Sequence, residues 1–217
     1  MKFVQPIMDI EDTRHHYPVF QFKDRLTGTP NDCAIPFSSE IKFNLFIRDM
    51  STDSKAGAPQ ATGDLMVVMK GAPERILSRC SKILINGQEL PYDKDQQMRV
   101  NGINDSLGKM GERVLAVAKY NLEPSLYPMD PAYNFDVKTW KSWKDVRNRD
   151  PSIAGWFPMF GLTLVGIVSL NDPPRPKVDQ SVLLCKEAGI KVIMVTGDQP
   201  PTAAAIAHKV NIISDPT

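Results

Sequence analysis

The stretches KFNLFIR at residues 42–48 and LMVVMKGAPERIL at residues 65–77 decide the fold of this chain. Apolar side chains alternate along both, which is the period of a β-strand with one buried face. The segment between them, DMSTDSKAGAPQATGD, is polar and contains Gly and Pro, so we predict a hairpin with a long turn. Matching apolar to apolar residues predicts a register in which Phe43 faces Met69, Leu45 faces Val67, and Lys42 therefore faces Lys70.

Two opposed lysines repel each other and weaken strand pairing. One interpretation is that both side chains point into water. The other is an anion site in which a phosphate or carboxylate relieves the repulsion. Phe37 lies five residues before Lys42, and an aromatic ring near two cations suits a nucleotide whose base stacks on the ring. From the residues alone both interpretations stay open, and so does a purely structural role for Phe37.

The residues after Lys70 suit the close approach of a ligand. Gly71 and Ala72 carry little or no side chain, and Pro73 is typical of the first turn of a helix. A helix N-terminus favours anions, although a simple strand-to-helix turn would explain the same residues. The chain contains neither the phosphate-loop pattern GxxxxGK[ST] nor GxGxxG, so any nucleotide binds without such a loop.

Composition excludes several classes of protein. The 217 residues are 42% hydrophobic and carry a formal net charge of +1, which is ordinary globular composition and argues against a nucleic-acid partner. The longest mostly apolar run, residues 160–170, is far shorter than the roughly 20 residues of a membrane helix. The three cysteines are widely spaced and show no metal-ligand pattern, so we expect reduced thiols and no metal site.

Prolines divide the chain. Residues 121–160 are rich in proline and read as a long irregular insertion with a short helix near residues 137–146. Its three tryptophans, Trp140, Trp143 and Trp156, either form an exposed binding surface or pack on the domain. The stretch NDPPRP at residues 171–176 has the composition of a hinge. We therefore predict one domain over residues 1–171 and a second segment over residues 172–217.

The second segment has the rhythm of a doubly wound sheet. Val178, Val182 and Cys185 recur at helical spacing, and Gly189 suits the end of that helix. The apolar run at residues 190–195 predicts a buried parallel strand, and residues 202–210 predict another helix.

Four ordered motifs carry a resemblance to a known family. MKGAPERILSRCSKIL begins at Met69, GERVLAVAKY at Gly111, VGIVSLNDPPRPKV at Val165 and AGIKVIMVTGDQPPTAAAIAH at Ala188. Together they resemble the cytosolic region of P-type cation-transporting ATPases, and within that superfamily the alpha subunits of sodium/potassium and proton/potassium pumps.

This resemblance implies an α/β fold: a mainly antiparallel sheet flanked by helices, followed by a partial haloacid-dehalogenase-like segment. It also implies that Phe37 stacks on adenine, that Lys42, Asn44 and Lys70 lie near the nucleotide, and that Gly71 and Ala72 form part of the pocket wall. Arg113 would contact the phosphates. Four further residues of the hinge and phosphorylation domain would lie near the nucleotide or the transferred phosphoryl group: Asp172, Thr196, Gly197 and Asp198.

The resemblance further implies an ATP-binding cytosolic domain of an integral membrane pump that couples ATP hydrolysis to cation transport with Mg²⁺. Its partners would be ATP and the remaining phosphorylation, actuator and membrane domains. The family's phosphorylated aspartate, in DKTGT, and its GDGxND motif do not occur in this sequence. We therefore expect a fragment without catalytic residues or turnover of its own. The alternative is a non-catalytic interaction module with a decayed pocket.

Other positions depart from the pattern of this pump branch. Asn44 stands where a glutamine is frequent, Ala118 replaces a cysteine, and Gln199 replaces a histidine. Asparagine is the shorter amide, so it reaches less far toward a nucleotide than a glutamine does.

Overall fold

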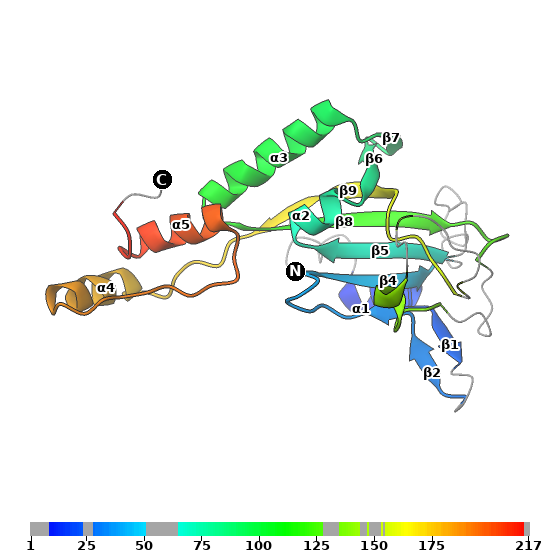
Figure 1. Ribbon diagram of the computed structural model, residues 1–217, viewed down its shortest axis with the longest axis horizontal. Helices are drawn as coiled ribbons and strands as arrows, with labels where there is room; N and C mark the ends of the chain where they lie inside the picture. Colours follow the sequence, from blue (N-terminus) through cyan, green and yellow to red (C-terminus); the bar gives the residue numbers. More distant parts are fainter. Residues whose placement is uncertain are drawn as a thin grey trace. The chain divides into compact units, whose positions relative to one another are not determined.

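The computed structural model describes residues 9–23, 28–50, 65–127, 135–143, 147, 153 and 155–214 (Figure 1). The chain forms two compact units. The first unit comprises Met1–Tyr92 and Val117–Gly166, and the second unit comprises Asp93–Ala116 and Ile167–Thr217. These units group residues by packing, and the predicted domain boundary at residue 171 stays a prediction.

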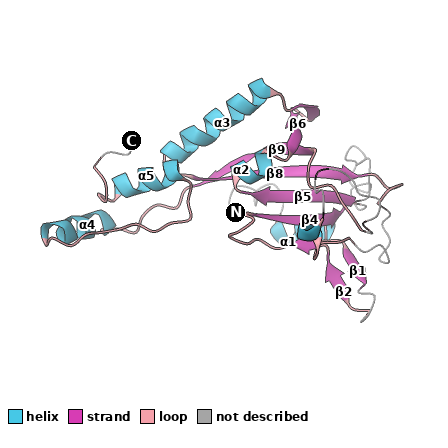
Figure 2. Cartoon of the chain, in the orientation of Figure 1, coloured by secondary structure: helices cyan, strands magenta, loops and turns pink. Residues whose placement is uncertain are grey.

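A seven-stranded sheet in the order β3-β4-β5-β8-β9-β6-β7 is the main element (Figure 2). Its strands are β3 Ala34–Ile35, β4 Phe43–Asp49, β5 Leu65–Gly71, β6 Cys80–Ile85, β7 Gln88–Pro91, β8 Arg113–Leu122 and β9 Leu162–Leu170. The pairs β3–β4, β4–β5 and β6–β7 are antiparallel, and β6–β9 is parallel. A separate antiparallel pair joins β1 Gln21–Lys23 to β2 Pro30–Asp32. The predicted mixed fold, a mainly antiparallel sheet with helices, is confirmed.

The predicted hairpin is present, but its predicted register is wrong by two residues. Phe43 pairs with Gly71 and Asn44 pairs with Lys70, so Lys42 and Lys70 do not oppose each other. A shift of two residues leaves every side chain on the same face, so apolar alternation cannot distinguish the two registers. The turn residues 51–64 lie outside the described residues.

Gly71 accounts for the observed register. A Cβ atom built on Gly71 would lie 2.4 Å from the Lys42 carbonyl oxygen and 2.6 Å from the Phe43 Cα atom. Only glycine therefore lets β5 run past the start of β4 at this distance. Lys42 itself lies outside the strand, with φ at 57° in the left-handed region.

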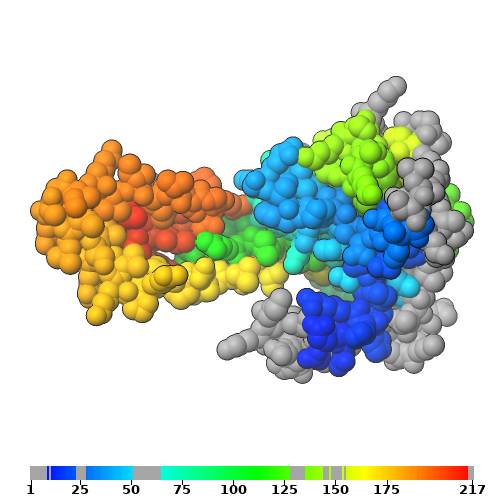
Figure 3. Space-filling view, turned by 90° about the horizontal axis from the view of Figure 1, so that it is seen from below, coloured from blue at the N-terminus to red at the C-terminus, as the bar shows by residue number. Residues whose placement is uncertain are grey.

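The inward face of β4 contacts the insertion at Phe43. Phe43 and Leu45 are buried, and the Trp140 ring lies 5.9 Å from the Phe43 ring, centroid to centroid. Figure 3 shows the insertion, in yellow-green, against the blue segment that contains β4. Trp143 and Trp156 are buried, so the hypothesis that they form an exposed binding surface is wrong. Where a short helix was expected near residues 137–146, the described part has the 3₁₀ turn η2, Trp140–Ser142, and residues 144–146 lie outside the described residues.

Asp136 holds this turn of the insertion in place. It accepts hydrogen bonds from the Thr139 backbone N–H at 2.9 Å, the Thr139 hydroxyl at 2.6 Å and Trp143 Nε1 at 2.7 Å. Burial alone would raise the pKa of Asp136, but these hydrogen bonds outweigh it and lower the pKa below 3.8. The charged form is therefore the one that the fold stabilises.

We expect Asp136→Asn to lower the free energy of unfolding at pH 7 by about 1–2 kcal/mol, because the carboxylate accepts three hydrogen bonds. A lowered pKa stabilises the fold above the unfolded value of about 4, and this stabilisation is lost as pH falls through the folded value. Urea unfolding at pH 7 and pH 3 measures the effect. The difference in the free energy of unfolding between wild type and Asp136→Asn should be smaller at pH 3 than at pH 7. An equal difference at both pH values would contradict a stabilising role for the Asp136 charge.

The first unit also holds two short helices, α1 Ile10–His16 and α2 Pro73–Leu77. Pro73 occupies the first turn of α2, as predicted. In the described part of the chain no helix is long and apolar enough to cross a membrane.

The second unit consists of α3 Lys94–Lys109, α4 Val178–Glu187, α5 Pro200–Lys209 and the adjoining ends of β8 and β9. The two predicted helices, α4 and α5, are confirmed. Gly189 has φ at 73°, its N–H donates to Lys186, and the Ile190 N–H donates to Cys185, so α4 ends in a Schellman motif.

The predicted strand at residues 190–195 is wrong. The segment has no regular structure, and Ile193 and Val195 are exposed. A parallel strand exists only where neighbours accept and donate its hydrogen bonds, and within the described ranges no strand pairs with this segment. The apolar composition of residues 190–195 predicts that the segment is buried. In the described part of the chain, Ile193 and Val195 are nevertheless exposed.

Candidate functional site

The predicted residues of the first unit gather where β4 begins and β5 ends. The Ala72 N–H donates to the Lys42 carbonyl at 2.9 Å, and the Lys42 N–H donates to the Ser38 carbonyl at 2.8 Å. Lys42 is thus the backbone link between the loop at residues 36–42 and the start of α2. Phe37 stands on the same loop with 64% of its surface exposed.

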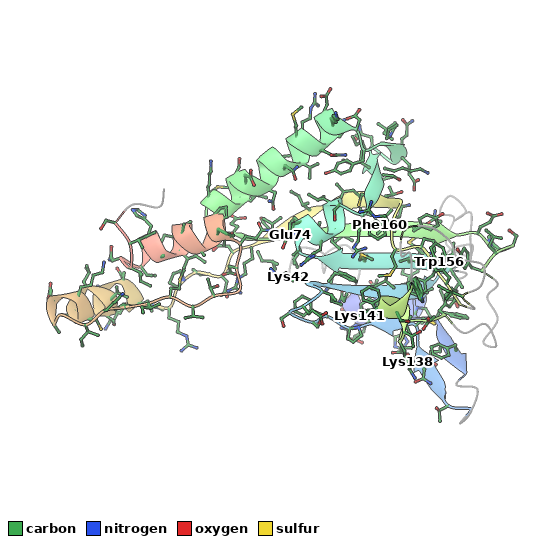
Figure 4. All side chains as sticks on the ribbon, viewed as in Figure 1. Lys42, Glu74, Lys138, Lys141, Trp156 and Phe160 are labelled. Atoms are coloured by element: carbon green, nitrogen blue, oxygen red, sulfur yellow. The ribbon has the colours of Figure 1, made fainter. Side chains whose placement is uncertain are left out.

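The Lys42 side chain lies near the first turn of α2. Its Nζ atom is 3.8 Å from Glu74 Oε1, and both side chains are nearly half exposed (Figure 4). An ion pair this long and this exposed contributes little. The ammonium can therefore move to an anionic ligand at small cost.

Asn44 and Lys70 are cross-strand neighbours and share one face of the sheet. Lys70 is exposed. The Asn44 side-chain oxygen is buried and accepts no hydrogen bond. A buried amide oxygen without a donor is uncommon in native proteins, and it marks a position where a donor from a ligand would be favourable.

The predicted residues of the second unit form a separate group. Arg113 Nε lies 2.9 Å from Asp198 Oδ1 and Arg113 Nη2 lies 3.3 Å from Asp198 Oδ2, so the guanidinium grips this carboxylate with two nitrogens. Arg113 Nη1 also lies 3.4 Å from Asp172 Oδ2. The Asp198 N–H donates to the Thr196 hydroxyl at 3.1 Å. A Cβ atom built on Gly197 would meet nothing within 4 Å.

This group is supported by contacts from α5. Thr202 is buried, and its hydroxyl donates to the Glu112 carbonyl at 3.1 Å, next to Arg113. Lys209 Nζ donates to the Met110 carbonyl at 2.8 Å. Sequence reasoning did not single out these two residues or α3. A local signal for this helix is Asp93, which caps it by accepting a hydrogen bond from the Gln96 N–H.

Metal and nucleophile chemistry have little support among the described residues. In that part of the chain no group of three or more His, Cys, Asp or Glu side chains is arranged to hold a metal ion. Burial, followed by the charge of Asp32, raises the pKa of Cys33 to about 12, and burial raises that of Cys80 to about 12. Both thiols are protonated at neutral pH and poorly nucleophilic.

The first unit therefore offers an exposed ring, two ammonium groups and a close turn of backbone, which are the groups that contact a planar base and a chain of phosphates. The second unit offers an arginine fork shared by two carboxylates. Each arrangement suits phosphate chemistry without supplying a nucleophile.

Comparison with known proteins agrees with these features. Residues 19–177 match the family model described as P-type ATPase, cytoplasmic domain N, and this chain belongs to that family. It is 42% identical over 183 residues to sodium/potassium-transporting ATPase subunit alpha-B of Artemia franciscana, covering 84% of this chain and 16% of the relative. The predicted resemblance is thereby confirmed.

Two further relatives fall in the same branch. Potassium-transporting ATPase alpha chain 2 of Cavia porcellus is 44% identical over 83% of this chain and 15% of its own length. Sodium/potassium-transporting ATPase subunit alpha-2 of Bos taurus is 42% identical over 91% of this chain and 17% of its own length. The chain thus spans about a sixth of the length of these relatives.

Proposed function

We propose that this chain binds the adenine nucleotide used by a P-type cation pump. The observation that carries this proposal is the exposed Phe37 ring on the loop that Lys42 ties to Gly71 and Ala72. Adenine stacks on Phe37, and the phosphates lie near the Lys42 and Lys70 ammonium groups. Gly71 and Ala72 form the wall, and Asn44 offers its free amide oxygen.

The remaining assignments follow the family. Residues 1–171 form the nucleotide-binding domain, and residues 172–217 form the hinge and part of the phosphorylation domain. Arg113 contacts the phosphates and exchanges its carboxylate partners for them. Asp172, Thr196, Gly197 and Asp198 lie toward the transferred phosphoryl group.

The complete pump would couple ATP hydrolysis to cation transport, of the sodium/potassium type, together with its phosphorylation, actuator and membrane domains. Mg²⁺ reduces charge repulsion at the phosphates when bound. The described residues do not fit a protein-held magnesium site, because Asp172 and Asp198 are paired with Arg113 and no metal-binding group is present among them.

A nucleotide titration of the chain by calorimetry or NMR tests this function. We expect ATP to bind with Kd of about 0.1–1 mM, and ADP and AMP almost as tightly, because stacking on Phe37 supplies most of the affinity. Phe37→Ala should abolish ATP binding at millimolar ATP concentrations. Leu90→Ala, which truncates another exposed apolar side chain of the first unit, should leave it unchanged.

Two results would contradict the proposal. One is equal ATP binding by wild type and Phe37→Ala. The other is a steep loss of affinity from ATP to AMP, which would place the main contacts on the phosphates. The alternative interaction module loses its main support because Trp143 and Trp156 are buried.

A further inference from the structure

The turn η2 of the insertion contacts the loop at residues 36–42 and the residue that follows it. The Trp140 ring lies 5.9 Å from the ring of Phe43, the first residue after the loop. Lys141 Nζ, on the side chain labelled in Figure 4, lies 2.8 Å from Glu40 Oε2 within the loop. All four residues belong to the first unit. Two neighbouring residues of the insertion thus reach the segment that carries Phe37.

The turn η2 is itself held on both sides. Asp136 accepts hydrogen bonds from the Thr139 N–H and hydroxyl just before the turn, and from Trp143 Nε1 just after it. Trp143 is buried, and its ring lies 5.3 Å from the Phe157 ring. A short segment that is joined to buried residues at both ends has little freedom to move. The turn therefore presents its two contact residues from a fixed backbone.

The loop needs support between its ends. Strand β3 ends directly before the loop and strand β4 begins directly after it, so the sheet holds both ends. Within the loop, the Lys42 N–H donates to the Ser38 carbonyl at 2.8 Å and closes a turn. Phe37 stands between the two strands with 64% of its surface exposed. An attachment at Glu40 therefore acts on the part of the loop that lies outside the sheet.

Trp140 contacts the sheet on the face opposite to the proposed nucleotide site. Side chains alternate along β4, so Phe43 points away from the face that carries Asn44. Asn44 shares its face with Lys70. Trp140 packs on Phe43 and so lies on the other side of the sheet from a nucleotide bound beside Asn44 and Lys70. An effect of Trp140 on nucleotide binding would therefore act through the loop.

We propose that the turn η2 is a brace that holds the loop at residues 36–42 in the conformation that binds nucleotide, an inference that rests on the proposed function of Phe37. A ring that is already held in place binds more tightly, because ordering a loop on binding costs free energy. Trp140 is the main positioning residue, since a large half-buried ring holds its neighbour more firmly than an exposed ion pair. The Lys141–Glu40 pair adds a second attachment, on the loop itself.

The brace is tested first without nucleotide, by ¹⁵N relaxation of the backbone N–H groups at residues 37–41 of the full chain. We expect order parameters of about 0.8 in the wild type and below about 0.6 in Trp140→Ala. Trp140→Phe keeps a ring against Phe43 and should restore most of this order. The N–H groups of β6 and β7 should be unaffected in both variants, which shows that the fold persists. Unchanged order at residues 37–41 in Trp140→Ala would overturn the proposal.

A charge exchange tests the second contact at exposed positions, where substitution does not threaten folding. Lys141→Glu places two carboxylates together and should weaken ATP binding about twofold to threefold. Adding Glu40→Lys restores an ion pair and should restore most of the affinity, which a merely structural role of Lys141 would not explain. Lys138→Glu makes the same charge change at another exposed lysine of the insertion, also labelled in Figure 4, and should leave the Kd unchanged. Equal Kd values for Lys141→Glu and Lys138→Glu would overturn the role of this pair.

An ATP titration of Trp140→Ala connects the brace to binding. We expect the Kd to rise about threefold to tenfold, and that of AMP by the same factor, because the loop acts on stacking and not on the phosphates. Unchanged ATP affinity in a variant whose loop order has fallen would overturn the positioning role. A wild type that binds no ATP would contradict the proposed function instead, and the relaxation measurement still decides whether the brace holds the loop.

Discussion

Gly71→Ala is expected to lower the free energy of unfolding by about 3 kcal/mol, at the upper end of what overpacking costs. The added methyl group would lie within 2.7 Å of three atoms, two of them backbone atoms of Lys42 and Phe43. Backbone atoms held by strand pairing cannot rotate away as a flexible side chain can. The end of β5 would therefore have to separate from β4, which breaks the Ala72–Lys42 hydrogen bond.

Urea unfolding measures this change, and Gly102→Ala is the matched control. Gly102 lies inside α3, and a Cβ atom there meets nothing within 4 Å. The same substitution should stabilise the chain at that site by about 0.5–1 kcal/mol, because alanine favours the helix. Opposite signs for one chemical change would establish the steric cause. A Gly71→Ala variant as stable as wild type would contradict the close approach of β5 to Lys42.

The β4–β5 hairpin also shows which part of the fold could be predicted from the sequence. Alternation along residues 42–48 and 65–70 predicts two strands, because a period of two is a local property. Alternation does not predict the register, because a shift of two residues leaves every side chain on the same face of the sheet. The register depends on the contact of Gly71 with Lys42, which is not local in sequence.

The error at residues 190–195 has a different physical cause. An apolar run indicates that a segment is buried in some assembly of residues, and it does not supply the neighbouring strands that a parallel sheet requires. The helices α4 and α5 were predictable, since a helix makes its hydrogen bonds within itself. The Schellman motif at Gly189 was predictable for the same reason.

The candidate site, like the fold, was only partly predictable from the sequence. The positions of the first unit could be selected from motifs and turn chemistry, because they lie in two short segments, residues 37–44 and 70–72. Thr202 could not, since its hydrogen-bond partner, the Glu112 carbonyl, belongs to a distant segment of the sequence. A contact between distant segments is visible only once the chain is folded.

The insertion is a second place where a single substitution should have a large effect. Phe157 is fully buried, and its ring lies 5.3 Å from the Trp143 ring and 6.2 Å from the Phe135 ring, each edge to face. Phe135 in turn contacts Phe20, which joins the insertion to the N-terminal part of the first unit. Although residues 121–160 look like a loop in sequence, five of their described aromatic side chains form core: Tyr127, Phe135, Trp143, Trp156 and Phe157.

Phe157→Ala should therefore lower the free energy of unfolding by about 3–5 kcal/mol, from lost transfer energy and the cavity left between the Trp143 and Phe135 rings. Denaturant unfolding followed by tryptophan fluorescence measures it, because Trp143 and Trp156 report on the same packing. Leu126→Ala, at a half-exposed position of the insertion, is the control and should change stability by less than about 1 kcal/mol. A small effect of Phe157→Ala would mean that the insertion lies on the unit without being part of its core.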